Sequence, residues 1–253
     1  MDFDWQVELK RAEHAALAAG ALLKAAMAGE KKILAEPGRD IKLQADRDAE
    51  ELILKVLSES PFGVLAEESG ESAALDPTKP FWIVDPLDGT LNFSRTIPFC
   101  AVSIALSTVS TPMLGVVYDF NRGELFSGVV GQGAWRNGAP MRVSSVTETS
   151  RAVLTAGFPV NFVYEDGPLM EFARMARSFR KLRMFGSAAL SLAYVAAGLA
   201  DAYAEDDIMF WDVAAGMALV EAAGGHVSCE DTRRLKWARR VRCASNASIW
   251  AQP

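Results

Sequence analysis

Residues 81–92 read FWIVDPLDGTLN, and this stretch decides which architecture we expect of the chain. The apolar run Phe81–Val84 predicts a buried strand, and Asp85 and Asp88 follow at its carboxyl end, where open α/β folds bind their ligands. The dipeptide Gly89-Thr90 comes where a helix is expected to begin, and free backbone N–H groups there bind anions such as phosphate. Carboxylates repel phosphate, so the sequence predicts cations between them, and Mg²⁺ is the hard, oxygen-preferring ion that suits such a site.

The bulk properties exclude several classes of protein. A length of 253 residues suits one large domain or two coupled subdomains, and a net charge of −6 argues against general affinity for nucleic acid. Three scattered cysteines and two histidines argue against a disulfide framework, a zinc site and histidine catalysis. The first residues do not resemble a signal peptide, and the most apolar window, 186–204, indicates a buried helix and a short strand rather than a membrane span. We therefore expect a cytoplasmic protein with no nucleic-acid or membrane partner.

Hydrophobic periodicity divides the chain into two parts. The N-terminal part combines two helices, expected over 5–29 and around 49–57, with an antiparallel meander over 99–143 that contains the hairpin signal Asn137-Gly138. After a polar stretch, strands and helices alternate; the expected elements are a strand over 152–156 and helices over 169–179, 187–197 and 211–223. We expect an N-terminal α+β subdomain, residues 1–146, and a C-terminal α/β subdomain, residues 147–253.

Acidic residues follow apolar stretches at three separate places. Glu67-Glu68 ends one expected strand, Asp85 and Asp88 end another, and Asp212 opens a helix. Each alone could be a turn or a helix cap. Burying so many carboxylates near one another is prohibitive unless cations pair them. A two-metal site, with ions about 4 Å apart, solves this problem, because one ion activates water and the other stabilises the leaving oxygen.

Several motifs in order resemble the inositol monophosphatase family. WIVDPLDGTLNF at 82–93 resembles the first signature of that family, and WDVAAG at 211–216, continuing to 225, resembles the second. The upstream acidic motifs and the segments between the signatures also match; they are Asp40 with Asp46, AEES at 66–69, GSAA at 186–189 and ADAYAE at 200–205. The resemblance implies a layered αβαβα sandwich with an antiparallel-rich N-terminal sheet and a smaller C-terminal α/β part. It also implies a homodimer, two or three Mg²⁺ ions and inhibition by lithium.

The same resemblance implies a role for each matching residue. The implied metal ligands are Glu67, Asp85 as the bridge, the backbone carbonyl of Leu87, Asp88, Asp212 and, through water on a weaker third ion, Asp46. Glu67, Thr90 and Asp88 are implied to be catalytic, with Thr90 paired to Glu67 so that it orients and deprotonates the attacking water. The implied substrate contacts are Gly89 and Thr90 at the phosphate and Gly186, Ser187, Ala188 and Glu205 at the alcohol.

One motif departs from the family pattern. The family usually has Val-Thr where this chain has Lys42-Leu43. A lysine that faced the site could weaken a third cation. We expect the side chain of Lys42 to point to solvent.

The sequence favours a small phosphorylated polyol as the substrate. The continuation Leu91-Asn92-Phe93 resembles members that act on inositol phosphates and fructose 1,6-bisphosphate, whereas nucleotidases more often have Lys-Glu-Phe. Our first prediction is a myo-inositol monophosphatase that hydrolyses inositol 1-phosphate without a covalent intermediate. Fructose 1,6-bisphosphatase activity, alone or in addition, is the alternative, followed by histidinol-phosphatase and 3′,5′-bisphosphate nucleotidase. An inactive sugar-phosphate-binding scaffold is the alternative from a different class. The basic residues Arg180, Lys181 and Arg183 could meet a second phosphate but are expected to face solvent or a dimer partner.

Overall fold

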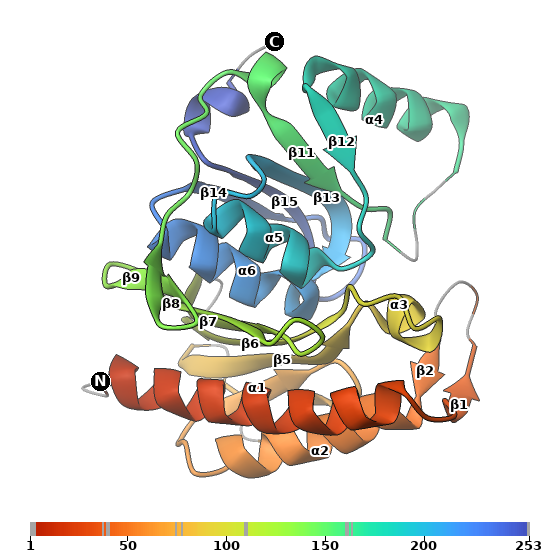
Figure 1. Ribbon diagram of the computed structural model, residues 1–253, viewed down its shortest axis with the longest axis vertical. Coiled ribbons are helices and arrows are strands. Elements are labelled where there is room, and N and C mark those ends of the chain that lie inside the picture. The colour runs from red at the N-terminus through yellow and green to blue at the C-terminus, as the bar shows by residue number, and fades with distance from the viewer. Residues whose placement is uncertain are drawn as a thin grey trace.

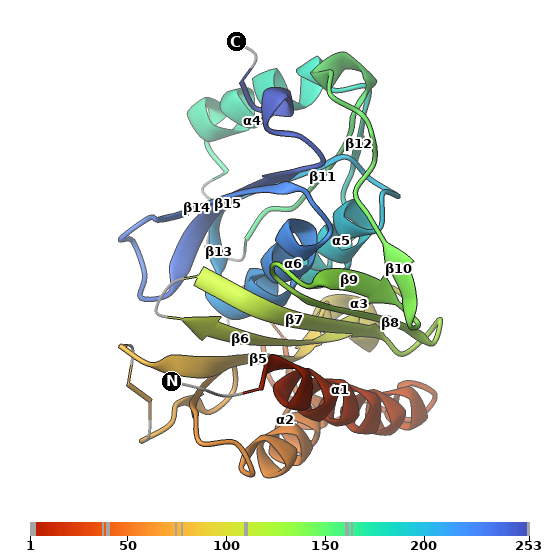
Figure 2. The same cartoon turned by 90° about the vertical axis from the view of Figure 1, so that its left-hand side faces the viewer.

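The computed structural model describes residues 4–36, 38, 41–73, 75–76, 78–108, 111–159, 162 and 164–251, so Asp40 lies outside the described residues. Helices and sheets alternate in five layers (Figures 1 and 2). The three helical layers are α1 (Trp5–Met27) with α2 (Gln44–Leu57), then α5 (Ala188–Ala196) with α6 (Phe210–Ala222), then α4 (Asp166–Ser178). This arrangement confirms the expected αβαβα sandwich.

The first sheet contains the predicted meander. Its eight strands have the order β10-β9-β8-β7-β6-β5-β3-β4. Their bounds are β3 (Gly63–Ala66), β4 (Gly70–Glu71), β5 (Pro80–Asp88), β6 (Ala101–Thr108), β7 (Thr111–Asp119), β8 (Glu124–Val129), β9 (Gly133–Arg136) and β10 (Ala139–Met141). Each strand from β5 to β10 pairs antiparallel with the next, whereas β3 and β5 are parallel. Asn137 and Gly138 have φ values of 50° and 77°, as a two-residue type I′ hairpin turn requires.

The second sheet is smaller and mixed. Its five strands have the order β12-β11-β13-β15-β14. Their bounds are β11 (Val153–Ala156), β12 (Lys181–Arg183), β13 (Ala202–Met209), β14 (His226–Asp231) and β15 (Ala238–Ala244). Strand β13 is longer than the short strand expected after α5, because its antiparallel pairing with β15 continues past a bulge to Met209. The remaining elements are the strands β1 (Ile33–Ala35) and β2 (Lys42–Leu43), the helix α3 (Thr90–Ser94) and the 3₁₀ turns η1 (Thr149–Arg151) and η2 (Ala247–Ile249).

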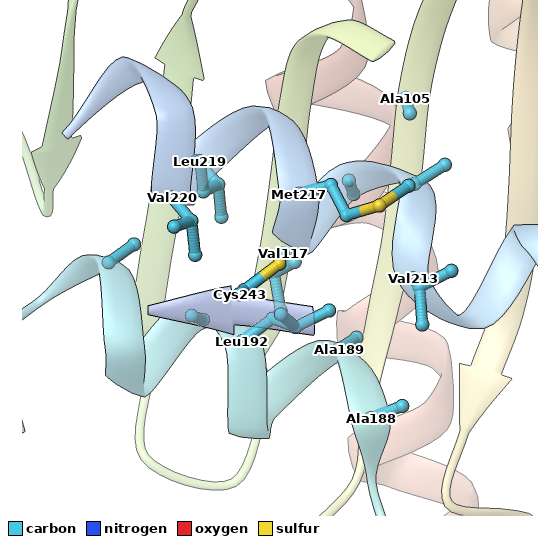
Figure 3. Close-up of a cluster of buried hydrophobic side chains, with 14 of the residues drawn as sticks. Ala105, Val117, Ala188, Ala189, Leu192, Val213, Met217, Leu219, Val220 and Cys243 are labelled. Carbon is cyan, nitrogen blue, oxygen red and sulfur yellow. The ribbon is translucent and has the colours of Figure 1, made fainter. Parts of the chain in front are cut away.

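Helix α6 is packed between the two sheets with almost no free space. A Cβ atom on Gly115 of β7 would lie 2.2 Å from the carbonyl oxygen of Ala215, and one on Gly216 would lie 2.3 Å from Cβ of Leu192 on α5. Figure 3 shows Met217 and Val213 of α6 and Leu192 of α5 among side chains of both sheets, such as Val117 and Cys243. Contacts shorter than van der Waals distance would force the backbone to move, so small residues fix the position of α6.

The expected subdomain boundary at residue 146 lies in the connection between β10 and β11. One core cluster joins Val117 and Phe126 of the first sheet to Tyr203 and Val241 of the second. Helices α5 and α6 pack against both sheets and belong to one core with them. The division into two subdomains therefore stays a prediction. None of the helices in the described part of the chain combines the length and apolar character needed to cross a membrane.

Candidate active site

A cavity of about 540 Å³ is lined by residues of both sheets and of the helices beside them. Its lining comes from the carboxyl end of β5, the start of α3, the last residues of β11 and β13, and the first turns of α5 and α6. The carboxylates that face it belong to Glu67, Asp85, Asp88, Glu205, Asp207 and Asp212. Segments far apart in sequence therefore bring their acidic residues to one place.

A β-bulge in β5 positions the first pair of acids. Asp85 lies opposite Ser103 and Asp88 lies opposite Ala101, so Pro86 and Leu87 together face one residue of β6. Such a bulge bends the strand and redirects its side chains. The N–H of Leu87 donates to Oδ1 of Asp85 at 2.9 Å, which fixes this carboxylate within the bulge.

Three carboxylates converge at the base of this bulge. One oxygen each of Glu67, Asp85 and Asp212 lies within 4.8 Å of the others; Asp85 is buried and the other two are half-buried. Burial, and then the negative charge of Glu67 and Asp88, raise the pKa of both Asp85 and Asp212 well above the ordinary value for an aspartate. Carboxylates in this state are stabilised by a cation, and hard oxygen ligands suit a divalent ion such as Mg²⁺. The residues present therefore fit a metal centre.

Asp88 lies beside this cluster and is held by the N-terminus of α5. Its Oδ2 accepts hydrogen bonds from the hydroxyl of Ser187 and, at 2.8 Å, from the N–H of Ala189, and its Oδ1 accepts from the N–H of Ala188 at 3.3 Å. Burial raises the pKa of Asp88 to about 6, although these bonds work in the opposite direction. Two residues expected at the substrate, Ser187 and Ala188, thus hold a carboxylate expected at the metal. Gly186, the third, precedes them with a φ of 76°.

The structure differs from the expected pairing of Thr90 with Glu67. The hydroxyl of Thr90 donates to the carbonyl oxygen of Leu87 at 3.0 Å, and a hydroxyl has a single proton to donate. Gly89 has a φ of 91°, and an added Cβ would lie 3.0 Å from the carbonyl oxygen of Phe99, so this position requires glycine. Gly89 and Thr90 both line the cavity, where α3 begins.

Lys42 corrects another expectation, because its side chain points into the acidic site and not to solvent. Its Nζ donates to Oε1 of Glu67 at 2.8 Å and to Oε1 of Glu68 at 2.5 Å. Burial works to lower the pKa of Lys42, but the two carboxylates outweigh it and hold the pKa above its ordinary value. Sequence reasoning missed this contact because a lysine in a two-residue strand carries no periodic signal.

Asp46 lies next to this ion pair on α2. Its Oδ2 accepts from the N–H of Leu43 at 2.7 Å, whereas its buried Oδ1 has no hydrogen-bond partner among the described residues. Burial raises the pKa of Asp46 to about 8. Asp46 is thus close enough to Glu67 and Glu68 to interact with their charges, but it does not belong to the cluster of three carboxylates.

Glu205 faces the cavity from the other sheet. A second bulge, between Glu205 and Ile208 of β13, includes Asp207 with a φ of 58°. The hydroxyl of Tyr203 donates to Oε2 of Glu205 at 2.9 Å, and burial raises the pKa of Glu205 to about 8. Tyr203 was not among the expected site residues, although the two-residue spacing places it on the same strand face as Glu205.

The basic residues Arg180, Lys181 and Arg183 are exposed, as expected. They are not among the described residues that line the cavity.

Comparisons with known proteins agree with this arrangement. The model of the inositol monophosphatase family matches residues 4–252. The inositol-1-monophosphatase of Synechocystis sp. is 38% identical over 252 residues, which cover 97% of this chain and 87% of that protein. The Nus factor SuhB of Pasteurella multocida is 40% identical over 193 residues, 74% of this chain and 71% of that protein. The crystal structure of the extragenic suppressor protein suhB from Bartonella henselae superposes with a TM-score of 0.85 at 36% identity, covering 96% of this chain and 95% of that one. This chain is therefore a member of the inositol monophosphatase family of phosphoric monoester hydrolases.

Proposed function

We propose that this protein hydrolyses a phosphate monoester with the help of Mg²⁺ and that inositol 1-phosphate is its preferred substrate. The observation that carries the proposal is the convergence of Glu67, Asp85 and Asp212 within 4.8 Å at the wall of the cavity. The relative from Synechocystis, which matches nearly the whole chain, is named for this activity. The family resemblance further suggests a homodimer, a cytoplasmic setting and inhibition by lithium, and these stay predictions.

The proposed metal ligands are the carboxylates of Glu67, Asp85, Asp88 and Asp212 and the carbonyl oxygen of Leu87. When bound, divalent ions would acidify water and neutralise phosphate charge, so that hydrolysis needs no protein nucleophile. The chain's own residues orient these ligands. Ser187, Ala188 and Ala189 fix Asp88, and the Leu87 N–H fixes Asp85.

The remaining cavity residues are proposed to bind the two ends of the substrate. Gly89 and Thr90 offer backbone N–H groups at the start of α3, where phosphate oxygens would accept them. Glu205 would bind a hydroxyl of the polyol, and Tyr203 orients it. With a pKa of about 8, the Glu205 carboxyl holds its proton at neutral pH and can both donate and accept a hydrogen bond.

The alternatives lack a comparable observation. A bisphosphate substrate would need a second anion site, but Arg180, Lys181 and Arg183 are not among the described residues that line the cavity. Some relatives are named Nus factor SuhB, whereas the net charge of −6 does not favour general nucleic-acid binding by this chain. The side chains of the cavity therefore favour hydrolysis of a monophosphorylated polyol.

The test is a kinetic panel with Mg²⁺ titrated. Phosphate release is measured from inositol 1-phosphate, fructose 1,6-bisphosphate, histidinol phosphate and 3′-phosphoadenosine 5′-phosphate. We expect Mg²⁺-dependent release with the highest kcat/KM for inositol 1-phosphate. A dominant preference for the nucleotide would overturn the substrate, and the absence of release from all four would overturn the hydrolase proposal.

A further inference from the structure

The position of Lys42 suggests how many cations the acidic centre holds. We propose, on the basis of the metal-dependent function above, that the ammonium group of Lys42 is a built-in cation of this centre. The centre then binds two divalent ions per chain, and the positive charge of Lys42 excludes a third.

The first support is the geometry of the ammonium group. Its Nζ contacts one oxygen of Glu67 at 2.8 Å and one of Glu68 at 2.5 Å, so it bridges two neighbouring carboxylates as a bound ion would. Glu67 also belongs to the cluster of three carboxylates with Asp85 and Asp212. The positive charge of Lys42 thus lies at the border of the proposed metal centre.

The backbone around Lys42 holds the ammonium group in place. Lys42 pairs with Ala35 and Leu43 pairs with Ile33 in the small ladder of β1 and β2. The N–H of Leu43 also donates to Asp46 at the start of α2. The side chain of Lys42 is 24% exposed and that of Glu68 is 7% exposed, so water screens this pair only in part. The lysine is therefore fixed at its base and at its tip.

The second support is the balance of charge on this side of the centre. Glu67, Glu68 and Asp46 form an acidic group that could itself attract a divalent ion, and Oδ1 of Asp46 is buried without a hydrogen-bond partner among the described residues. An ion that contacted the same oxygens as Nζ would be repelled by the ammonium at close range. Lys42 therefore supplies one positive charge here and excludes a second cation.

The experiment counts bound ions directly. Mn²⁺ stoichiometry is measured by calorimetry on the full chain, and Mn²⁺ positions are located by anomalous diffraction from soaked crystals. We expect two ions per chain in the native protein, with Nζ of Lys42 between Glu67 and Glu68. In Lys42→Met, which keeps the length and removes the charge, we expect a third ion beside Glu67 and Glu68.

Lys55→Met is the matched control, because Lys55 is an exposed lysine on α2; this variant should bind two ions. Lys42→Gln provides a second, polar replacement in case Lys42→Met fails to fold, which circular dichroism would reveal, and it should also bind three ions. Three ions in the native protein, or two in a folded Lys42 variant, would overturn the inference.

Phosphate release, measured separately, distinguishes this inference from the proposed function. A native protein that hydrolyses inositol 1-phosphate while holding three ions refutes only the role of Lys42. If the native protein binds two ions and the Lys42 variants bind three, but no phosphate ester is hydrolysed, only the proposed function is refuted. A native protein that binds no Mn²⁺ refutes both.

Discussion

Strands β5 and β13 approach the cavity from different sheets, and each places a buried acid beside a bulge. Asp85 on β5 has carboxylates for neighbours, Glu67 and Asp212. Glu205 on β13 instead accepts a hydrogen bond from the hydroxyl of Tyr203. The same kind of bulge thus serves two different sites. The cluster around Asp85 has several carboxylates for the one ammonium group of Lys42 and suits divalent ions, whereas Glu205 is paired with the hydroxyl of Tyr203 and suits a neutral hydroxyl of the substrate.

The largest effect is expected from Asp212→Asn. This change removes one carboxylate from the cluster of Glu67, Asp85 and Asp212 without changing the size of the side chain. Turnover of inositol 1-phosphate should fall about 10³-fold, the scale of losing a main electrostatic contribution to catalysis. Asp166→Asn, at an exposed position in the first turn of α4, is the control and should keep full activity. Equal turnover in both variants would mean that Asp212 does not belong to the catalytic centre.

The stability of the metal-free protein should depend on pH. The pKa is raised for Asp85 and Asp212, to about 6 for Asp88 and to about 8 for Glu205. The folded state therefore binds more protons than the unfolded chain between pH 4 and 8, approximately, so stability decreases as pH rises through this window. We expect a loss on the order of a few kcal/mol, or roughly 5–10 °C in Tm, by calorimetry.

Adding Mg²⁺ to the same experiment distinguishes the acids around Asp85 from Glu205 by their contribution to the pH dependence of stability. Saturating Mg²⁺ binds the folded state and should remove most of this pH dependence, because most of the titrating acids lie on the side of β5. If stability rises with pH without metal, the buried acids are not protonated as described.

Asn92→Ala breaks a link between α3 and the loop before α5. Nδ2 of Asn92 donates to the carbonyl oxygens of Phe99 and Phe185, both at 2.8 Å, and is 3.3 Å from that of Gly186. Losing these bonds leaves partly buried carbonyls without a donor, so unfolding in urea should show a loss of about 2 kcal/mol. A loss below about 0.5 kcal/mol would show that the loop before α5 is held by other contacts.

The smallest effect is expected from Tyr203→Phe on the side of β13. This change removes the hydrogen bond to Glu205 and should lower kcat/KM for inositol 1-phosphate about 5–10-fold, as a loss of roughly 1 kcal/mol implies. If Tyr203 acts only by orienting Glu205 toward a polyol hydroxyl, phosphate release from p-nitrophenyl phosphate, which has no such hydroxyl, should stay within about 2-fold of the native rate. An equal loss of kcat/KM for both substrates would mean that Tyr203 has a structural role and does not act through the polyol.

The sequence predicted the main helices and strands because its strongest signals are local, whereas the five-layer sandwich was implied by the family resemblance. Helical spacing located α1, and the apolar run before Asp85 located β5. The turn residues Asn137 and Gly138 located the β9–β10 hairpin. The two signature motifs also indicated that Asp85 and Asp212, distant in sequence, would meet.

The contacts that the sequence did not predict join distant residues through individual side chains. Lys42 reaches Glu67 across 25 positions, and Asp88 accepts hydrogen bonds from α5 about 100 positions away. Thr90 donates to Leu87, three residues away, although Glu67 was expected. Each choice depends on the distances among several acceptors, and no periodic pattern records those distances.

The tight seat of α6 between β7 and α5 has a mechanical consequence. The contacts of Gly115 and Gly216 restrict sliding and tilting of α6, so they hold Asp212, in its first turn, in a fixed position relative to β7 and α5. We expect selectivity among the proposed divalent ions to depend on how well each ion fits carboxylates that are held in place.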